Sequence, residues 1–336
     1  MRTRFGPDAW WRAVLTSSPA PGGFAGGPPG PRARLSARRP VAGLLAVLAL
    51  LTLVACGDNN DDEADEAAPP AAAQDAGGGS PERIVSLSPT ATEMLFAIGA
   101  GDQVVAVDDQ SDFPAGVPVT DLSGFEPNLE AIADFEPDLV VMSDAPEAIS
   151  AGLEALEIDL IVNPTAVALD DSYDQIAELG VATGHEDEAA DLVAAMRSDI
   201  DELAAEVQER DEPLTYYHEL TDELFSATSD TFIGEIYALA GLANVADPAD
   251  ADGGGFPKLS AEFLVDADPD LVFLADTECC GQTAETFAAR PGFGDLTAVT
   301  EGRVIELDDD TASRWGPRVV DFLRSIVDAT AAVPAG

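Results

Sequence analysis

The sequence predicts an α/β fold with two lobes, each a mainly parallel sheet flanked by helices, joined by a single long helix. Short runs rich in Val, Ile and Leu alternate with helix-like segments, the pattern of βαβ units and parallel sheets. One stretch occurs twice and aligns without a gap, as EAIADFEPDLVVMSD at 130–144 and EFLVDADPDLVFLAD at 262–276. A long amphipathic helix pattern separates the two copies. We therefore expect two lobes built on related plans.

The elements of the first half reappear in the second. In the first half we expect helices at 90–101 and 128–135 and strands at 83–87, 104–107, 138–143 and 159–163. In the second half we expect a helix at 231–241 and strands at 214–220, 270–276 and 303–307. A further repeat supports duplication, because EMLFAIG (93–99) and EIYALAG (235–241) each carry a Glu six residues before a Gly. For the PDLV motif alone, convergence is the alternative, since Pro-Asp ends a helix and Leu-Val begins a buried strand.

The joining helix is predicted over 187–210, which contains no Gly or Pro and carries an apolar stripe of Leu192, Met196, Ile200, Leu203 and Val207. Such a helix would measure roughly 35 Å, enough to cross the back of two lobes. A single stiff helix also permits less hinge motion than extended strands would. A second amphipathic helix is expected at 316–332. The folded part is therefore divided into a lobe at 83–186, the joining helix and a lobe at 211–336.

The N-terminal region has the features of a secretory signal. RARLSARRP (32–40) precedes an uncharged apolar run of about 15 residues, too short for a typical spanning helix. The run ends in LVAC (53–56), which resembles the lipobox of bacterial lipoproteins and implies acylation of Cys56; the alternative is a membrane anchor with a chance cysteine. We expect residues 1–56 to be a signal peptide and 57–82 a flexible acidic tether. The folded part is then held at the extracytoplasmic face, at a cell surface or in a periplasm.

Charge and missing motifs exclude several functions. The chain has 63 acidic and 16 basic residues, a formal net charge of −47, so its surface repels phosphate backbones and nucleic acid is not an expected partner. The sequence contains no P-loop, HExxH or GxSxG motif, so neither nucleotide-driven transport nor a known catalytic motif is indicated. We expect a protein that is not an enzyme and has no cofactor of its own.

The residues 83–330 resemble a known family as a whole. The motifs that carry the likeness are RIVSLSPTATE, QSDFP, NLEAIADFEPDLVV, TFIGEIYALAGLANV, GFPKLSAEFLVDADPDLVFL and SRWGPRVVDFL. They resemble the substrate-binding proteins of ABC importers for iron-siderophore, haem and cobalamin, the class with a helical backbone between its lobes. The resemblance implies a shallow ligand cleft between the lobes and a monomer that delivers a metal chelate or corrinoid to an import permease.

The resemblance also implies how the permease is contacted. By motif, Glu130 in PNLEAI and Glu262 in LSAEFL would dock to arginines of the permease dimer. A permease with two equivalent halves has a twofold axis, so a monomer that touches both halves alike needs one docking group in each lobe. The alternative is that both are ordinary acids favouring a helix N-terminus.

Several residues are candidates for ligand contact. Arg314 and Trp315 in DDDTASRWGPR suit a flat ligand with carbonyl or carboxylate groups, and Asp310 is expected nearby; the alternative is a surface ion pair with a packed Trp. His218, at a strand end, is a weaker candidate, with a structural histidine as its alternative. The loop and turn candidates are Ser88, Gln110, Phe125 and Phe256.

Cys279 and Cys280 are adjacent, and outside the membrane a vicinal disulfide at the rim of the cleft is predicted. Reduced thiols or ligation of a thiophilic metal are the alternatives.

The implied function is a lipid-anchored receptor for an iron-siderophore, haem or cobalamin. Few basic residues disfavour highly anionic siderophores, and SRWGPR favours a corrinoid. The competing functions are a receptor or haem relay of the same fold without an importer, and an enzyme acting on a metal complex.

Overall fold

The computed structural model describes residues 79–334, which form one compact unit. The signal segment, Cys56 and most of the tether lie outside the described residues. Within residues 79–334, no helix is long and apolar enough to cross a membrane.

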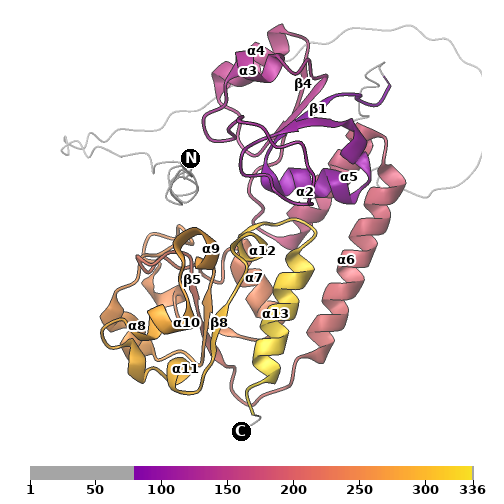
Figure 1. Cartoon of the computed structure of the whole chain (residues 1–336). Helices are drawn as coiled ribbons and strands as arrows, with labels where there is room; N and C mark the ends of the chain where they lie inside the picture. Colours follow the sequence, from indigo (N-terminus) through magenta and orange to yellow (C-terminus); the bar gives the residue numbers. More distant parts are fainter. Residues whose placement is uncertain (1–78, 335–336) are drawn as a thin grey trace, which may run out of the picture. The chain divides into compact units, whose positions relative to one another are not determined.

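Two separate four-stranded parallel sheets carry the fold (Figure 1). The first sheet has the order β2-β1-β3-β4, from β1 (Ile84–Leu87), β2 (Val104–Val107), β3 (Leu139–Met142) and β4 (Asp159–Val162). The second has the order β6-β5-β7-β8, from β5 (Thr215–Glu219), β6 (Ala243–Asn244), β7 (Leu271–Leu274) and β8 (Val304–Glu306). Counted along the chain, the two orders are identical, which confirms the expected two lobes on one plan.

Helices cover both faces of each sheet, so the central strands are buried on both sides and are apolar almost throughout. The helices of the first lobe are α2 (Pro89–Ala97), α3 (Leu129–Ala133), α4 (Glu147–Ala155) and α5 (Leu169–Thr183). Those of the second are α7 (Phe232–Leu239), α8 (Ala261–Ala267), α9 (Thr277–Cys280), α10 (Ala284–Ala288), α11 (Thr297–Thr300), α12 (Asp309–Ser313) and α13 (Val319–Ala331).

The repeated stretch performs the same structural task in each lobe. The Asp138 carboxylate accepts the backbone N–H groups of Glu82 (2.8 Å) and Arg83 (3.0 Å), just before β1. Asp270, its counterpart, accepts the N–H and hydroxyl of Thr215 at 2.8 and 2.9 Å, at the start of β5. The acids Glu136 and Asp268, also counterparts, both adopt positive φ, 48° and 41°. The copies therefore share backbone geometry as well as sequence, and each Asp joins the amino ends of two neighbouring strands.

The joining helix is α6 (Glu186–Glu206), 21 residues and about 32 Å long. Its buried side chains Met196, Ile200 and Leu203 belong to a single apolar cluster that includes residues of α5 in the first lobe and α13 in the second. Figure 1 shows α6 running past both lobes with α13 beside its lower half. One core therefore connects the two sheets through α6.

The seven strands expected from the sequence are all present, and α6, α7 and α13 overlap the expected helices, although α6 ends at Glu206 and not at residue 210. Two elements were not expected: β6, which has only two residues, and α5, whose buried stripe includes the polar residues Ser172, Gln175 and Thr183. The lobe boundaries at 83–186 and 211–336 stay a prediction.

Candidate ligand-binding site

The candidate site lies at the carboxyl ends of the strands, because ligands of open α/β sheets bind there. In the first lobe β1 leads into Ser88 and β2 into Asp108. In the second, β5 ends at Glu219 and β7 is followed by Asp276.

Buried hydroxyl groups line this edge in the first lobe. Ser88 is the N-cap of α2, where its Oγ accepts the N–H of Ala91 at 3.3 Å, and the Ser143 hydroxyl donates to Ser88 at 2.8 Å. Thr92 donates to Ser86 at 2.9 Å and lies 3.0 Å from the Ser111 hydroxyl. The Ser88 hydroxyl is therefore already hydrogen-bonded to Ala91 and Ser143, and a ligand would have to compete with these groups to contact it.

Asp108 and Gln110 follow β2. Asp108 is buried, and burial raises its carboxyl pKa to about 6, although the Ser111 N–H donates to it at 2.9 Å. The Gln110 side chain is exposed, and its backbone carbonyl accepts Arg314 Nη2 at 3.2 Å. A segment of the first lobe thus contacts the second at this edge.

Arg314 does not present a free guanidinium. Its Nη1 donates to Glu93 Oε1 of α2 at 2.8 Å, and its Nη2 lies 2.7 Å from Asp310. Arg318 donates to the same glutamate from Nε at 2.9 Å and from Nη2 at 2.6 Å. The side chain of Glu93 is only 1% exposed, against 10% for Arg314 and 17% for Arg318. These three residues form a buried ion-pair cluster that joins the two lobes.

Asp310, the expected neighbour of Arg314, is in place. Burial raises its carboxyl pKa to about 6, and Arg314 acts in the opposite direction. Asp310 therefore belongs to the same ionic cluster.

Trp315 lies against the first lobe. Its indole N–H donates to Gln175 Oε1 of α5 at 2.8 Å, and its carbonyl accepts the Ser172 hydroxyl at 2.5 Å. The side chain is buried in the core that both lobes share. In this structure the Trp315 ring packs between the lobes. This agrees with the alternative to ligand contact, in which Trp315 is a packing residue.

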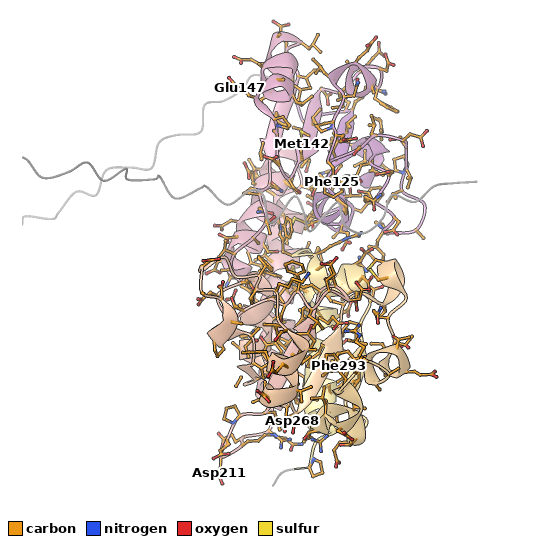
Figure 2. The ribbon with its side chains drawn as sticks, turned by 90° about the vertical axis from the view of Figure 1, so that its left-hand side faces the viewer. Phe125, Met142, Glu147, Asp211, Asp268 and Phe293 are labelled. Atoms are coloured by element: carbon orange, nitrogen blue, oxygen red, sulfur yellow. The ribbon has the colours of Figure 1, made fainter. Side chains whose placement is uncertain are left out.

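The aromatic loop candidates differ in exposure. Phe125 is 42% exposed; in Figure 2 it lies below Met142 and Glu147, on the side of the first lobe toward the second. Phe256 is partly buried and packs on the shared core. Phe113, which was not predicted as a ligand contact, is 43% exposed, and its ring centroid lies 4.4 Å from Cζ of Arg318. Phe113 and Phe125 are the aromatic side chains open to a ligand among these.

His218 is fully buried. Its Nδ1 lies 2.8 Å from the Tyr237 hydroxyl, and Phe322 packs edge-on against the ring. Burial lowers its pKa to about 3, so the imidazole is neutral at physiological pH. This is the environment of a structural histidine, the alternative to ligand contact.

A second buried ionic cluster closes the same edge of the second lobe. Arg290 donates to both oxygens of Glu219, at 2.7 and 2.6 Å, and the Tyr217 hydroxyl donates to Glu219 at 3.1 Å. Asp276 lies beside this cluster with neither carboxylate oxygen hydrogen-bonded within the described residues. Burial first, and the Glu219 charge second, raise the pKa of Asp276 to about 8. Only its position at the end of the repeated stretch could have indicated Asp276 from sequence.

The predicted disulfide is not formed in the structure, where Cys279 and Cys280 are free thiols. They end α9, a helical turn whose N–H groups at Thr277 and Cys279 donate to the Asp309 carboxylate at 2.7 and 2.8 Å. Asp309 therefore holds this turn without a ring. Burial raises the pKa of both thiols, so they are protonated at neutral pH.

Glu130 and Glu262 occupy equivalent places. Each is exposed and is the second residue of its helix, after the N-caps Asn128 of α3 and Ser260 of α8. In Figure 1, α3 lies at the outer end of the first lobe and α8 at the left-hand side of the second. The geometry agrees equally with docking and with a helix-terminal acid.

Two hollows in the described part of the chain lie elsewhere. One of about 510 Å³ is lined by the ends of α6 and α7, at the amino ends of the strands, and one of about 370 Å³ is lined by residues between 164 and 178. Within residues 79–334, no group of three or more His, Cys, Asp or Glu side chains is placed to hold a metal ion.

The fold and this arrangement define a two-lobed binding protein. Residues 84–311 match the periplasmic binding protein family, so the chain belongs to that family. Its members are binding proteins and not enzymes, which confirms the expected class.

Three similar proteins illustrate the range of the family. An uncharacterised ABC transporter substrate-binding lipoprotein of Bacillus subtilis is 28% identical over 74% of this chain and 80% of its own length. A cobalamin-binding protein of Halobacterium salinarum is 29% identical over 74% of this chain and 69% of its own length. The structure of a periplasmic haem-binding protein from Roseiflexus is 26% identical, with a TM-score of 0.63, over 75% of this chain and 100% of that one. The compounds named for these relatives are bound ligands and not resident cofactors.

Proposed function

We propose that this chain is an extracytoplasmic solute-binding lipoprotein that delivers cobalamin or another metal complex to an ABC import permease. Family membership over residues 84–311, in a chain with two sheets of identical order, is the observation that carries the proposal. The LVAC motif supports lipid anchoring through Cys56, and a relative described as a lipoprotein supports it further.

The ligand is proposed to bind as a single molecule to a monomer, against the carboxyl ends of both sheets. Phe113 and Phe125 supply exposed aromatic surface from the first lobe. The second lobe supplies the loop with Phe256 and the ionic cluster of Arg314 and Asp310. An aromatic and acidic surface suits a large ring without many negative charges, so a corrinoid is favoured over an anionic siderophore.

Titration of purified protein tests the ligand. We expect cyanocobalamin to raise the thermal unfolding midpoint more than haemin or ferric citrate at the same free concentration, because stabilisation follows ligand affinity. Stabilisation by haemin or ferric citrate but not by cyanocobalamin would contradict the preference for a corrinoid.

Glu130 and Glu262 are proposed as the permease-docking pair. Their equivalent positions in two lobes match the twofold symmetry of a permease dimer, and a carboxylate forms strong bidentate contacts with Arg. The Glu130→Ala, Glu262→Ala double variant should bind ligand normally and lose uptake of radiolabelled ligand by cells.

A matched control uses Asp134→Ala with Asp266→Ala, which removes exposed acids from the same two segments of the repeat. Uptake should survive in that control. Equal uptake by both double variants would exclude the docking role of Glu130 and Glu262.

A further inference from the structure

The repeated helices α2 and α7 each carry a glutamate whose side chain contacts the other lobe. Glu93 of α2 accepts Arg314 and Arg318 of the second lobe. Glu235, its counterpart in α7, accepts the N–H of Leu169 at the start of α5 in the first lobe, at 2.7 Å. Both glutamates therefore cross between the lobes, but only Glu93 contacts cations.

The protein engages every guanidinium nitrogen of Arg318 and both terminal nitrogens of Arg314. All three nitrogens of the Arg318 guanidinium are used, because Nη1 donates to the Thr311 hydroxyl at 3.2 Å while Nε and Nη2 donate to Glu93. One face of the group lies over Phe113. Arg314 is enclosed by Glu93, the Gln110 carbonyl and Asp310.

Negative charges outnumber positive ones at this cluster. Besides Glu93, the carboxylates of Asp112, Asp308 and Asp310 lie within 4.0 Å of one guanidinium or the other, at 3.7, 3.5 and 2.7 Å. An anion that approached Arg314 would meet net negative charge. It would also have to displace a carboxylate that is almost fully buried, and an unpaired buried charge is strongly disfavoured.

We infer that Glu93 determines ligand specificity by occupying Arg314 and Arg318, so that the site rejects ligands with carboxylate groups and accepts uncharged or cationic ring complexes. Glu93 acts through the arginines and is a positioning residue. This inference rests on the proposed function, because it concerns the ligand of the same site. Figure 1 shows α12 and the start of α13, which flank these arginines, at the side of the second lobe nearest α2.

Glu93→Gln tests the inference, since it keeps the side-chain shape and removes one charge. Binding of haemin, which carries two carboxylates, and of cyanocobalamin is measured by fluorescence quenching on wild-type and variant protein. We expect affinity for haemin to rise at least tenfold and affinity for cyanocobalamin to change less than threefold. Glu235→Gln is the matched control, because it loses a contact between lobes without releasing an arginine; its ratio of affinities should stay that of the wild type. If the ratio of haemin affinity to cyanocobalamin affinity is the same in Glu93→Gln and Glu235→Gln, the inference is overturned.

A second measurement does not depend on the ligand. Phenylglyoxal modifies accessible arginines, and peptide mass spectrometry reports each site. In wild-type protein Arg314 and Arg318 should react at least tenfold more slowly than the exposed Arg324, and Glu93→Gln should reduce that difference. Reaction of Arg314 and Arg318 at the rate of Arg324 in the wild type would overturn the inference even if none of the tested ligands binds. If neither haemin nor cyanocobalamin binds while Arg314 and Arg318 stay protected from phenylglyoxal, the result contradicts the proposed function but not this inference.

A second variant is available if Glu93→Gln fails to fold. Asp310→Asn, at a partly exposed position, should shift the haemin preference in the same direction by a smaller factor.

Discussion

Asp144 and Asp276 occupy the same place in the repeated stretch and have opposite environments. Asp144 is exposed, whereas Asp276 is buried beside Glu219 and Arg290. In the second lobe Arg290 donates to both oxygens of Glu219 and to Gln282 Oε1, and none of these hydrogen bonds reaches Asp276. Asp276 therefore holds a proton at neutral pH, with a pKa of about 8.

That proton makes stability depend on pH. Between the unfolded pKa of 3.8 and the folded pKa of about 8, the native state binds more protons at Asp276 than the unfolded state does. The contribution of Asp276 to the free energy of unfolding thus falls with rising pH, by up to about 1.4 kcal/mol per pH unit, and levels off above pH 8. We predict that Asp276→Asn, relative to wild type, gains stability steadily from pH 5 to pH 8. Urea unfolding at intervals of one pH unit measures the difference; a constant difference would contradict the raised pKa.

Arg290 is predicted to be indispensable to this cluster. Arg290→Met leaves Glu219 buried without its cation and should lower the free energy of unfolding by about 3–5 kcal/mol. Arg324→Met, at an exposed site, should change it by less than about 0.5 kcal/mol. Chemical denaturation at pH 7 compares the two variants, and similar losses in both would show that the Arg290 pair contributes little.

At the scale of elements, the PDLV motif is a strand-joining device. Its Asp accepts N–H groups at the amino end of the neighbouring strand in both lobes, which explains why the motif recurs. The sequence predicted the strands well, because β-branched runs bounded by Pro and Gly identify a buried parallel strand without knowledge of its neighbours. It did not predict β6, whose two residues pair with β5 and are also held by the Asn244 side chain, which donates to the Tyr216 hydroxyl and the Ala227 carbonyl.

We predict unequal costs for the two copies. Asp270 is partly buried and also binds the Thr215 hydroxyl, whereas Asp138 is exposed, so Asp270→Ala should cost about 1–3 kcal/mol and Asp138→Ala about 0.5–1.5 kcal/mol. Asp144→Ala, an exposed acid of the same repeat, is the control and should be close to neutral. Denaturant midpoints rank the stability of the variants, provided that the dependence of the free energy of unfolding on denaturant concentration is unchanged. A larger loss of stability in Asp138→Ala than in Asp270→Ala would contradict this account.

At the scale of the molecule, the site depends on contacts that no local pattern reveals. Arg314 and Glu93 are separated by 221 positions, and which acid neutralises an arginine in so acidic a chain is decided only by packing. The resemblance implied that Arg314 of SRWGPR lies in the ligand cleft, which stays a prediction. The residues of SRWGPR, however, contact the first lobe, and the sequence offered no way to distinguish a ligand contact from a contact between lobes.

The shared core also predicts how the chain unfolds. Leu203 of α6 is buried in the cluster that contains side chains of α5 and α13, so α6 cannot separate from one lobe without exposing apolar surface of the other. Leu203→Ala should therefore cost about 2–5 kcal/mol and destabilise both lobes together. Val181→Ala, at an exposed position of α5, is the control. Hydrogen exchange under mild denaturant should show β1 and β7 losing protection at the same denaturant concentration in the wild type and shifting in parallel in Leu203→Ala. Loss of protection in one sheet at a concentration that leaves the other intact would mean that the lobes unfold independently and that α6 is only a connector.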